Sequence, residues 1–117
     1  MTMTTSTEQF FGAWGEAHAA ARVGAVRAAM TDAATYADPR TPEPLTGADA
    51  VTGYVGMFVE MAPGAQAVVI KSDTNGASER ATIAFRMADG KEQLGQYFID
   101  HDGDKIVRMV GYVGTGA

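Results

Sequence analysis

A single carboxylate stands where it could carry out proton transfer. Asp38 follows the short apolar stretch 34–37 and precedes Pro39, which cannot continue a strand because proline has no backbone N–H. An aspartate before a proline also favours a turn, since its side chain accepts hydrogen bonds from nearby backbone N–H groups. Two interpretations stay open: Asp38 shapes a turn, or it points into an apolar cavity, where a carboxylate is a better proton acceptor.

Three side chains could assist such a base. Tyr36 lies two residues before Asp38, so an extended segment would present both on one side. Trp14 and His18 are four residues apart, which puts them on one face of a helix. The indole could donate a hydrogen bond to a ligand, and the imidazole could orient Asp38 or move a proton. Each also has an ordinary interpretation, as a core aromatic or as a solvated histidine.

Tyr97 could donate a hydrogen bond to an oxygen that becomes negative during a reaction. In a strand only one of Gln96 and Tyr97 can face a cavity, and the sequence leaves that choice open. Tyr97 could equally pack in the core or in a dimer interface. The remaining candidates for ligand contact, with Gln96 and Tyr36, are mostly apolar, although a methionine-rich core gives the same pattern: Tyr54, Phe58, Met61, Phe85, Met87, Met109 and Val113.

The spacing of the apolar residues changes along the chain, from a helical period to the alternation that is typical of strands. Helical spacing predicts helices over 7–21, 23–30 and 48–62, and a brief strand over 35–37. Ser6 with Gln9, and Thr46 with Asp49, indicate helix N-caps. Strands are predicted over 65–73, 81–88, 92–101 and 105–113, because turn signals separate them at 75–76, 89–90 and 102–104.

Four consecutive strands joined by hairpin turns predict an antiparallel meander. The order of elements indicates an α+β fold, in which three helices pack on the concave face of a cone-shaped, curved antiparallel sheet. The open end of such a cone is a common place for a ligand. We expect a single domain over residues 1–117, with about six flexible residues at its start.

The composition argues against several classes of protein. The formal net charge is -5 with no basic cluster, so we expect neither a nucleic-acid nor a membrane partner. Without cysteine there is no thiol chemistry, and without a leader-like or membrane-spanning stretch we expect a cytoplasmic protein. His101 lies among Asp100, Asp102 and Asp104 in a turn lacking the calcium-loop pattern, and there is no glycine-rich phosphate loop. We therefore expect no metal and no cofactor.

Three segments resemble a known superfamily: residues 31–39, 43–51 and 103–109. The first is similar to the pattern DDAT-x-x-DP of ketosteroid isomerases, and the second to the G-x-x-A-[IV] that opens their third helix. With the order of elements, they resemble the NTF2-like superfamily in its SnoaL-like and ketosteroid-isomerase-like branch. In the isomerases the aspartate of the DP pair moves a proton beside a carbonyl, so the resemblance implies this role for Asp38.

The chain departs from the isomerase pattern at the two donors that hold the oxyanion. Trp14 stands in place of a tyrosine, and Tyr97, or Gln96 in an ungapped alignment, in place of a protonated aspartic acid. The resemblance thus implies related proton transfer rather than Δ5-3-ketosteroid isomerisation itself. An epoxide-hydrolysing branch uses an Asp–Arg–Asp site, but Arg86 and Arg108 alternate with apolar residues and should point away from the cavity.

The first functional hypothesis is a small cofactor-free enzyme, of isomerase or cyclase type. Asp38 would act as general acid and base on a hydrophobic carbonyl compound. The alternatives are a non-catalytic protein that binds a small hydrophobic molecule, and a dimeric interaction module. In each case we expect a homodimer through the outer sheet face, which carries Thr82, Ala84 and Arg86.

Overall fold

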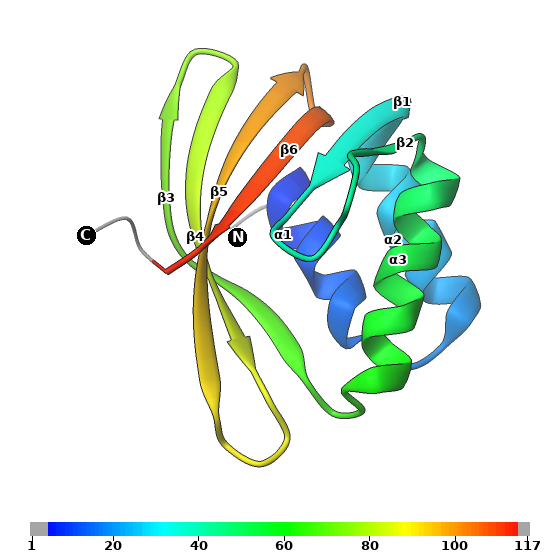
Figure 1. Cartoon of the computed structure of the whole chain (residues 1–117). Helices are drawn as coiled ribbons and strands as arrows, with labels where there is room; N and C mark the ends of the chain where they lie inside the picture. The colour runs from blue at the N-terminus through cyan, green and yellow to red at the C-terminus, as the bar shows by residue number, and fades with distance from the viewer. Residues whose placement is uncertain (1–4, 115–117) are drawn as a thin grey trace, which may run out of the picture.

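The computed structural model describes residues 5–114. Its elements are α1 (Ser6–Gly12), a 3-10 turn η1 (Ala13–Gly15), α2 (Ala19–Ala29), β1 (Met30–Ala37), β2 (Leu45–Thr46), α3 (Ala48–Met61), β3 (Gln66–Asn75), β4 (Ser78–Arg86), β5 (Glu92–Asp102) and β6 (Lys105–Val113). The three helices lie together against one face of a curved sheet (Figure 1). The predicted α+β architecture is confirmed.

The sheet holds six strands in the order β2-β1-β6-β5-β4-β3. Strands β3 to β6 form the predicted antiparallel meander. Gly76, Gly90 and Gly103 lie in its three turns with φ of 61°, 89° and 62°, a left-handed conformation that glycine adopts without strain. The sheet is nevertheless mixed, because β1 runs parallel to β6 and antiparallel to β2.

The expected single helix over 7–21 is wrong. Helix α1 ends at Gly12, η1 follows, and Glu16 and His18 are extended before α2 begins. Glycines at 12 and 15 weaken a continuous helix, and the break lets Trp14 turn into the core. The N-cap is Thr5, paired with Glu8 in a capping box one residue before the expected one. The flexible start falls mostly on residues 1–4, which lie outside the described residues.

The junction between α2 and β1 also differs from expectation. Helix α2 spans Ala19–Ala29, so it starts and ends earlier than the predicted 23–30. Strand β1 begins at Met30 and not at Thr35, because its backbone pairs with β6 from Met30 to Ala37. Pairing between strands distant in sequence thus overrides the local helix signal.

Helix α3 lacks the predicted side-chain N-cap. Thr46 belongs to the short strand β2, and Gly47 takes the N-cap position with φ 95°. The Gly47 N–H donates to the Ala34 carbonyl at 2.8 Å, which fixes the start of α3 beside β1. Since α3 carries Tyr54 and Phe58, this turn sets where the helix presents them to the sheet.

The core lies between the helices and the sheet. Its largest fully buried side chains include Phe10, Phe11, Tyr36, Met30 and Ile83.

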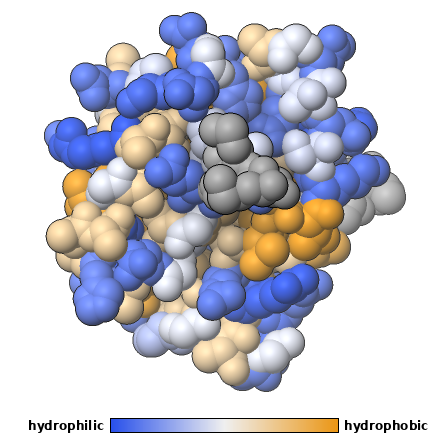
Figure 2. All heavy atoms as spheres, turned by 180° about the vertical axis from the view of Figure 1, so that it is seen from behind, coloured by the Kyte–Doolittle hydropathy of each residue, from blue (hydrophilic) through white to orange (hydrophobic). Residues whose placement is uncertain are grey.

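Figure 2 shows mostly hydrophilic side chains on one face of the molecule, with an apolar patch beside the grey residues. Over the described residues, no helix has the length and apolar character needed to cross a bilayer.

Candidate functional site

Asp38 is the first residue after β1, and its carboxylate serves the turn with one oxygen. Oδ1 accepts hydrogen bonds from the backbone N–H of Arg40 at 2.8 Å and of Thr41 at 3.1 Å. The Thr41 hydroxyl donates to the Asp38 carbonyl at 3.0 Å and completes the turn. The turn interpretation of Asp38 is therefore correct for Oδ1, which leaves Oδ2 to face the interior.

Oδ2 of Asp38 accepts hydrogen bonds from two phenols. Tyr36 and Tyr54 each donate to it at 2.7 Å. The Tyr36 and Tyr97 hydroxyl oxygens are 2.8 Å apart. Because the single proton of Tyr36 is directed to Asp38, Tyr97 must donate to Tyr36. The result is a chain of hydrogen bonds from Tyr97 through Tyr36 to the carboxylate.

The environment keeps all three phenols protonated. Burial raises the pKa of Tyr36 well above its ordinary value, and the nearby Tyr97 and Asp38 raise it further. Burial also raises the pKa of Tyr54, with added contributions from its hydrogen bond to Asp38 and from the Asp38 charge. For Tyr97, burial raises the pKa although the hydrogen bond to Tyr36 opposes the rise. Each phenol is therefore a hydrogen-bond donor at neutral pH.

A cavity of about 80 Å³ opens beside this chain of phenols. It is lined by Trp14, Asp38, Pro39, Arg40, Tyr54, Phe58, Phe85, Met87, Gln93, Leu94, Gly95, Tyr97, Tyr112 and Val113. Aromatic and aliphatic side chains predominate, with a few polar groups at one side. This composition is typical of a site for a small, mostly apolar molecule.

Trp14 contributes a hydrogen-bond donor that is not used within the protein. The side chain is 3% exposed, and its ring packs on Phe58 at 4.9 Å between centroids. Its indole N–H has no hydrogen-bond partner among the described residues. A buried donor without an acceptor costs about 1–3 kcal/mol. An acceptor oxygen on a bound molecule would remove this cost.

The structure decides which of Gln96 and Tyr97 faces the cavity. Tyr97 is 3% exposed and points toward the helices, where it meets Tyr36 and Phe11. Gln96 lies on the opposite face of the sheet, where it lines an open hollow with Ile70 and Thr82. Gln96 therefore does not line this cavity, because neighbouring strand residues point to opposite faces.

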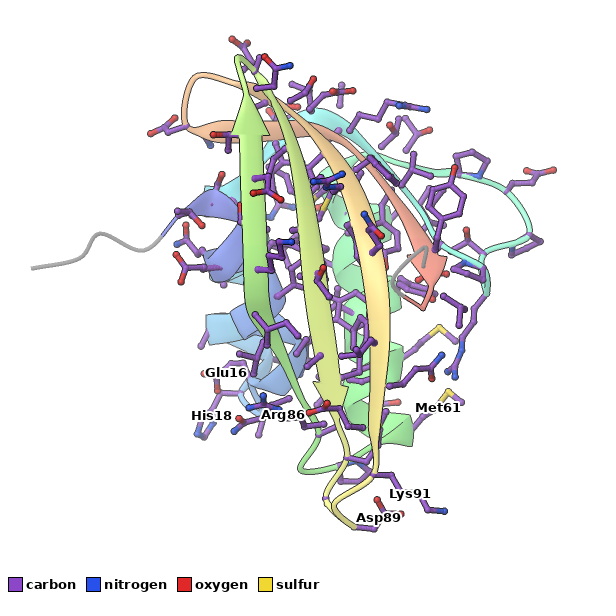
Figure 3. All side chains as sticks on the ribbon, turned by 90° about the vertical axis from the view of Figure 1, so that its left-hand side faces the viewer. Glu16, His18, Met61, Arg86, Asp89 and Lys91 are labelled. Carbon is purple, nitrogen blue, oxygen red and sulfur yellow. The ribbon has the colours of Figure 1, made fainter. Side chains whose placement is uncertain are left out.

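His18 and Met61 also lie away from the cavity. His18 is exposed at the N-cap of α2, where its backbone N–H bonds to the Glu16 side chain at 3.0 Å. The shared face with Trp14 is lost because the helix ends before it reaches His18. Met61, at the last position of α3, is 75% exposed. Figure 3 shows both side chains at the lower end of the molecule, projecting from the helical layer.

The other expected contacts separate into two groups. Tyr54, Phe58, Phe85, Met87 and Val113 line the cavity. Tyr36 and Met109 are fully buried in the core, and Tyr36 reaches the site only through its hydroxyl group. Both arginines considered for a hydrolase site lie on the outer face as expected: Arg86 pairs with Glu92 at 2.9 Å and Arg108 with Asp100 at 3.7 Å.

Six lining residues were not predicted from the sequence: Pro39, Arg40, Gln93, Leu94, Gly95 and Tyr112. Arg40 follows Asp38 by two residues, but its place depends on the path of the turn. Gly95 carries a usable signal, because a glycine inside a strand often marks a close approach of another group. Within residues 5–114, no cluster of side chains has the composition of a metal site.

Comparison with known proteins identifies the fold. No protein-family model and no curated protein matches this chain. A candidate isomerase of the SnoaL-like family from Agrobacterium tumefaciens superposes with a TM-score of 0.83 at 19% identity, covering 94% of this chain and 95% of that one. The chain thus has the fold of NTF2-like proteins, as the order of elements predicted.

Two further solved structures share this fold. A hypothetical protein from Catenulispora acidiphila with a ketosteroid-isomerase-like fold, in complex with trimethylamine, gives a TM-score of 0.77 at 14% identity over 95% of this chain and 86% of that one. A candidate SnoaL-like polyketide cyclase from a Jannaschia species gives 0.74 at 12% identity, over 97% and 89%.

Proposed function

We propose that the protein is a small isomerase- or cyclase-type enzyme that moves a proton beside a carbonyl group, with Asp38 as general base and acid. The observation that carries the proposal is that one apolar cavity is lined by this carboxylate, by Tyr54, which donates to it, and by Trp14, whose buried indole N–H is unused. Solved structures of the same fold include a candidate isomerase and a candidate polyketide cyclase.

The steps follow from the positions of the donors. Oδ2 of Asp38 takes a proton from the carbon beside the carbonyl and later returns it to another carbon. Trp14 donates its unused indole N–H to the carbonyl oxygen as it becomes negative. Tyr97 joins it only by turning its single proton from Tyr36 to that oxygen. Oδ2 already accepts hydrogen bonds from two phenols, so one of these bonds must break before Oδ2 can take a proton. Tyr54 is the one that yields, because it is half-buried at the cavity wall whereas Tyr36 is fully buried.

The second candidate function is binding without catalysis. The four donors on Asp38 favour it, because they occupy the lone-pair sites that a base needs. One protein of the same fold holds the small molecule trimethylamine. Under this alternative, Asp38 orients Tyr36 and Tyr54, and the cavity holds a ligand that leaves unchanged.

Exchange of carbon-bound protons separates the two functions. Cyclohexanone and levulinate are incubated with the protein in D2O, and loss of their α-protons is followed by NMR. We expect exchange above the buffer rate for at least one compound, and its abolition in Asp38→Asn. Asp100→Asn, on the outer face, is the matched control and should retain the activity. Exchange unchanged in Asp38→Asn rejects the base, and no exchange with either compound favours binding.

We also propose that two copies associate through the outer sheet face. Ile70, Phe98 and Tyr112 expose apolar surface, with 47%, 46% and 56% of each residue accessible. The Phe98 and Tyr112 rings pack together with centroids 5.7 Å apart. Charged pairs such as Arg108–Asp100 border them, as in the polar rim of an interface. Sedimentation of a monomer at micromolar concentration would contradict this dimer.

A further inference from the structure

Two charged side chains line the cavity among the described residues, and only one is positive. Arg40 is exposed at the rim, in the loop after β1. Its backbone N–H donates to Oδ1 of Asp38 at 2.8 Å, which fixes the residue beside the opening. The position of Arg40 is thus set by the same turn that places the carboxylate.

The guanidinium of Arg40 differs from that of every other arginine in the described chain. Arg27, Arg80, Arg86 and Arg108 pair with carboxylates, and Arg22 donates to the Glu16 carbonyl. Arg40 has no carboxylate oxygen within 4.0 Å and no side-chain hydrogen bond among residues 5–114. Its planar set of donors is therefore available to a ligand.

The charge of Arg40 also reaches the interior of the cavity. Burial raises the pKa of both Tyr54 and Tyr97, and the positive charge of Arg40 opposes part of each rise. The guanidinium therefore lies close enough to stabilise negative charge near these two hydroxyl groups. It can act on a bound anion from the side of the opening.

We propose that the cavity takes a small apolar acid, whose hydrocarbon part packs on the aromatic wall while Arg40 binds its carboxylate. The inference rests on the proposed function and narrows its substrate class to small apolar keto acids. A chain of net charge -5 repels anions at long range, so an anionic ligand needs a local cation of this kind. Arginine suits the task because its fork matches the two oxygens of a carboxylate.

An aromatic cavity with an aspartate could instead hold an ammonium ion. Two observations disfavour this. Both oxygens of Asp38 already accept two donors each, so a cation would have to displace one of them to reach a lone pair. The exposed guanidinium at the rim would repel a second positive charge. The cation is therefore the competing outcome of the test.

Fluorescence of Trp14, the single tryptophan and a lining residue, reports binding directly. The probes are benzoate, benzamide and benzylamine, which share a ring and carry negative, zero and positive charge at neutral pH. We expect benzoate to bind most tightly. Arg40→Gln should weaken benzoate by about tenfold or more, the value of a hydrogen bond to a charged group, and change benzamide less than about twofold.

The controls separate charge from damage to the site. Arg40→Lys should retain part of the benzoate affinity, and Arg86→Gln, which removes the same charge from the outer face, should change nothing. Unchanged circular dichroism verifies the fold of each variant. Benzoate that binds no better than benzamide or benzylamine, does not bind at all, or is indifferent to Arg40→Gln overturns the proposal. These titrations do not depend on turnover, so the failure of Asp38 as a base would leave their outcome unchanged.

Discussion

Tyr97 lies flat over Gly111, its direct partner on the neighbouring strand. A Cβ atom added at Gly111 would come within 2.5 Å of Cε2 and 2.6 Å of Cζ of the Tyr97 ring. No methyl group fits in that space. The absence of a side chain at one position of β6 therefore determines where the Tyr97 hydroxyl meets Tyr36.

Gly111→Ala should displace the Tyr97 ring and break its hydrogen bond to Tyr36. We expect the free energy of unfolding to fall by about 1–3 kcal/mol, because the buried ring has little space to move. Urea unfolding measures this change, and Trp14 fluorescence should report weaker binding of benzoate. Equal stability with intact binding would show that the ring adjusts freely.

The control for this change is Gly53→Ala. Gly53 is exposed within α3, and an added Cβ would meet nothing within 4 Å. The substitution should raise the free energy of unfolding by about 0.5–1 kcal/mol, because alanine loses less backbone freedom in a helix than glycine. The same chemical change thus has opposite signs at the two positions.

Tyr36 and Tyr97 should be energetically coupled. Each single change to phenylalanine leaves a hydroxyl group without its buried partner, whereas the double change removes both groups. In a double-mutant cycle measured by urea unfolding, we expect a coupling of about 0.5–1.5 kcal/mol. Lys91→Gln, at an exposed position in the turn between β4 and β5, is the control, and its combination with Tyr97→Phe should be additive within about 0.5 kcal/mol. Additivity of Tyr36→Phe and Tyr97→Phe would contradict the hydrogen bond between them.

The parts of the fold that depend on local signals could be predicted. The turn pairs at Asn75-Gly76 and Asp89-Gly90 give the meander its register, and the period of the apolar residues gives α3. The parallel pairing of β1 with β6 could not be predicted, because it joins segments about seventy residues apart with no shared turn. That pairing extends β1 back to Met30 at the expense of the predicted helix.

The site could be predicted only where the spacing of residues in the sequence determines the direction in which their side chains point. Tyr36 and Asp38 share a side because both lie on one extended segment, and they are hydrogen-bonded. The predicted partnership of Trp14 with His18 fails, because it assumed a continuous helix across Gly15. The hydrogen bond from Tyr54 and the rim position of Arg40 depend on how α3 and the turn are placed in space. Sequence spacing carries no information on such contacts.

A buried carboxylate outside the cavity, that of Glu79, holds α1 against the sheet. Glu79 on β4 is 8% exposed and accepts hydrogen bonds from Thr7 at 2.6 Å, Ser72 at 2.5 Å and His101 at 2.7 Å. Burial alone would raise the pKa of Glu79, but the hydrogen bonds from Ser72, Thr7 and His101 outweigh it. The net effect lowers the pKa below its ordinary value of 4.5.

This shift predicts how stability depends on pH. A carboxyl group with a lowered pKa in the folded protein stabilises the fold above its unfolded pKa of 4.5, and this contribution disappears as the pH falls through the folded value. Glu79→Gln should therefore cost about 1–3 kcal/mol at neutral pH, and the difference from the unsubstituted protein should shrink as the pH falls below 4.5. Urea unfolding between neutral and acidic pH measures both quantities. Glu92→Gln, at an exposed pair with Arg86, should cost less than about 1 kcal/mol. A deficit in Glu79→Gln that persists unchanged into acid would mean that the network acts through packing and not through its charge.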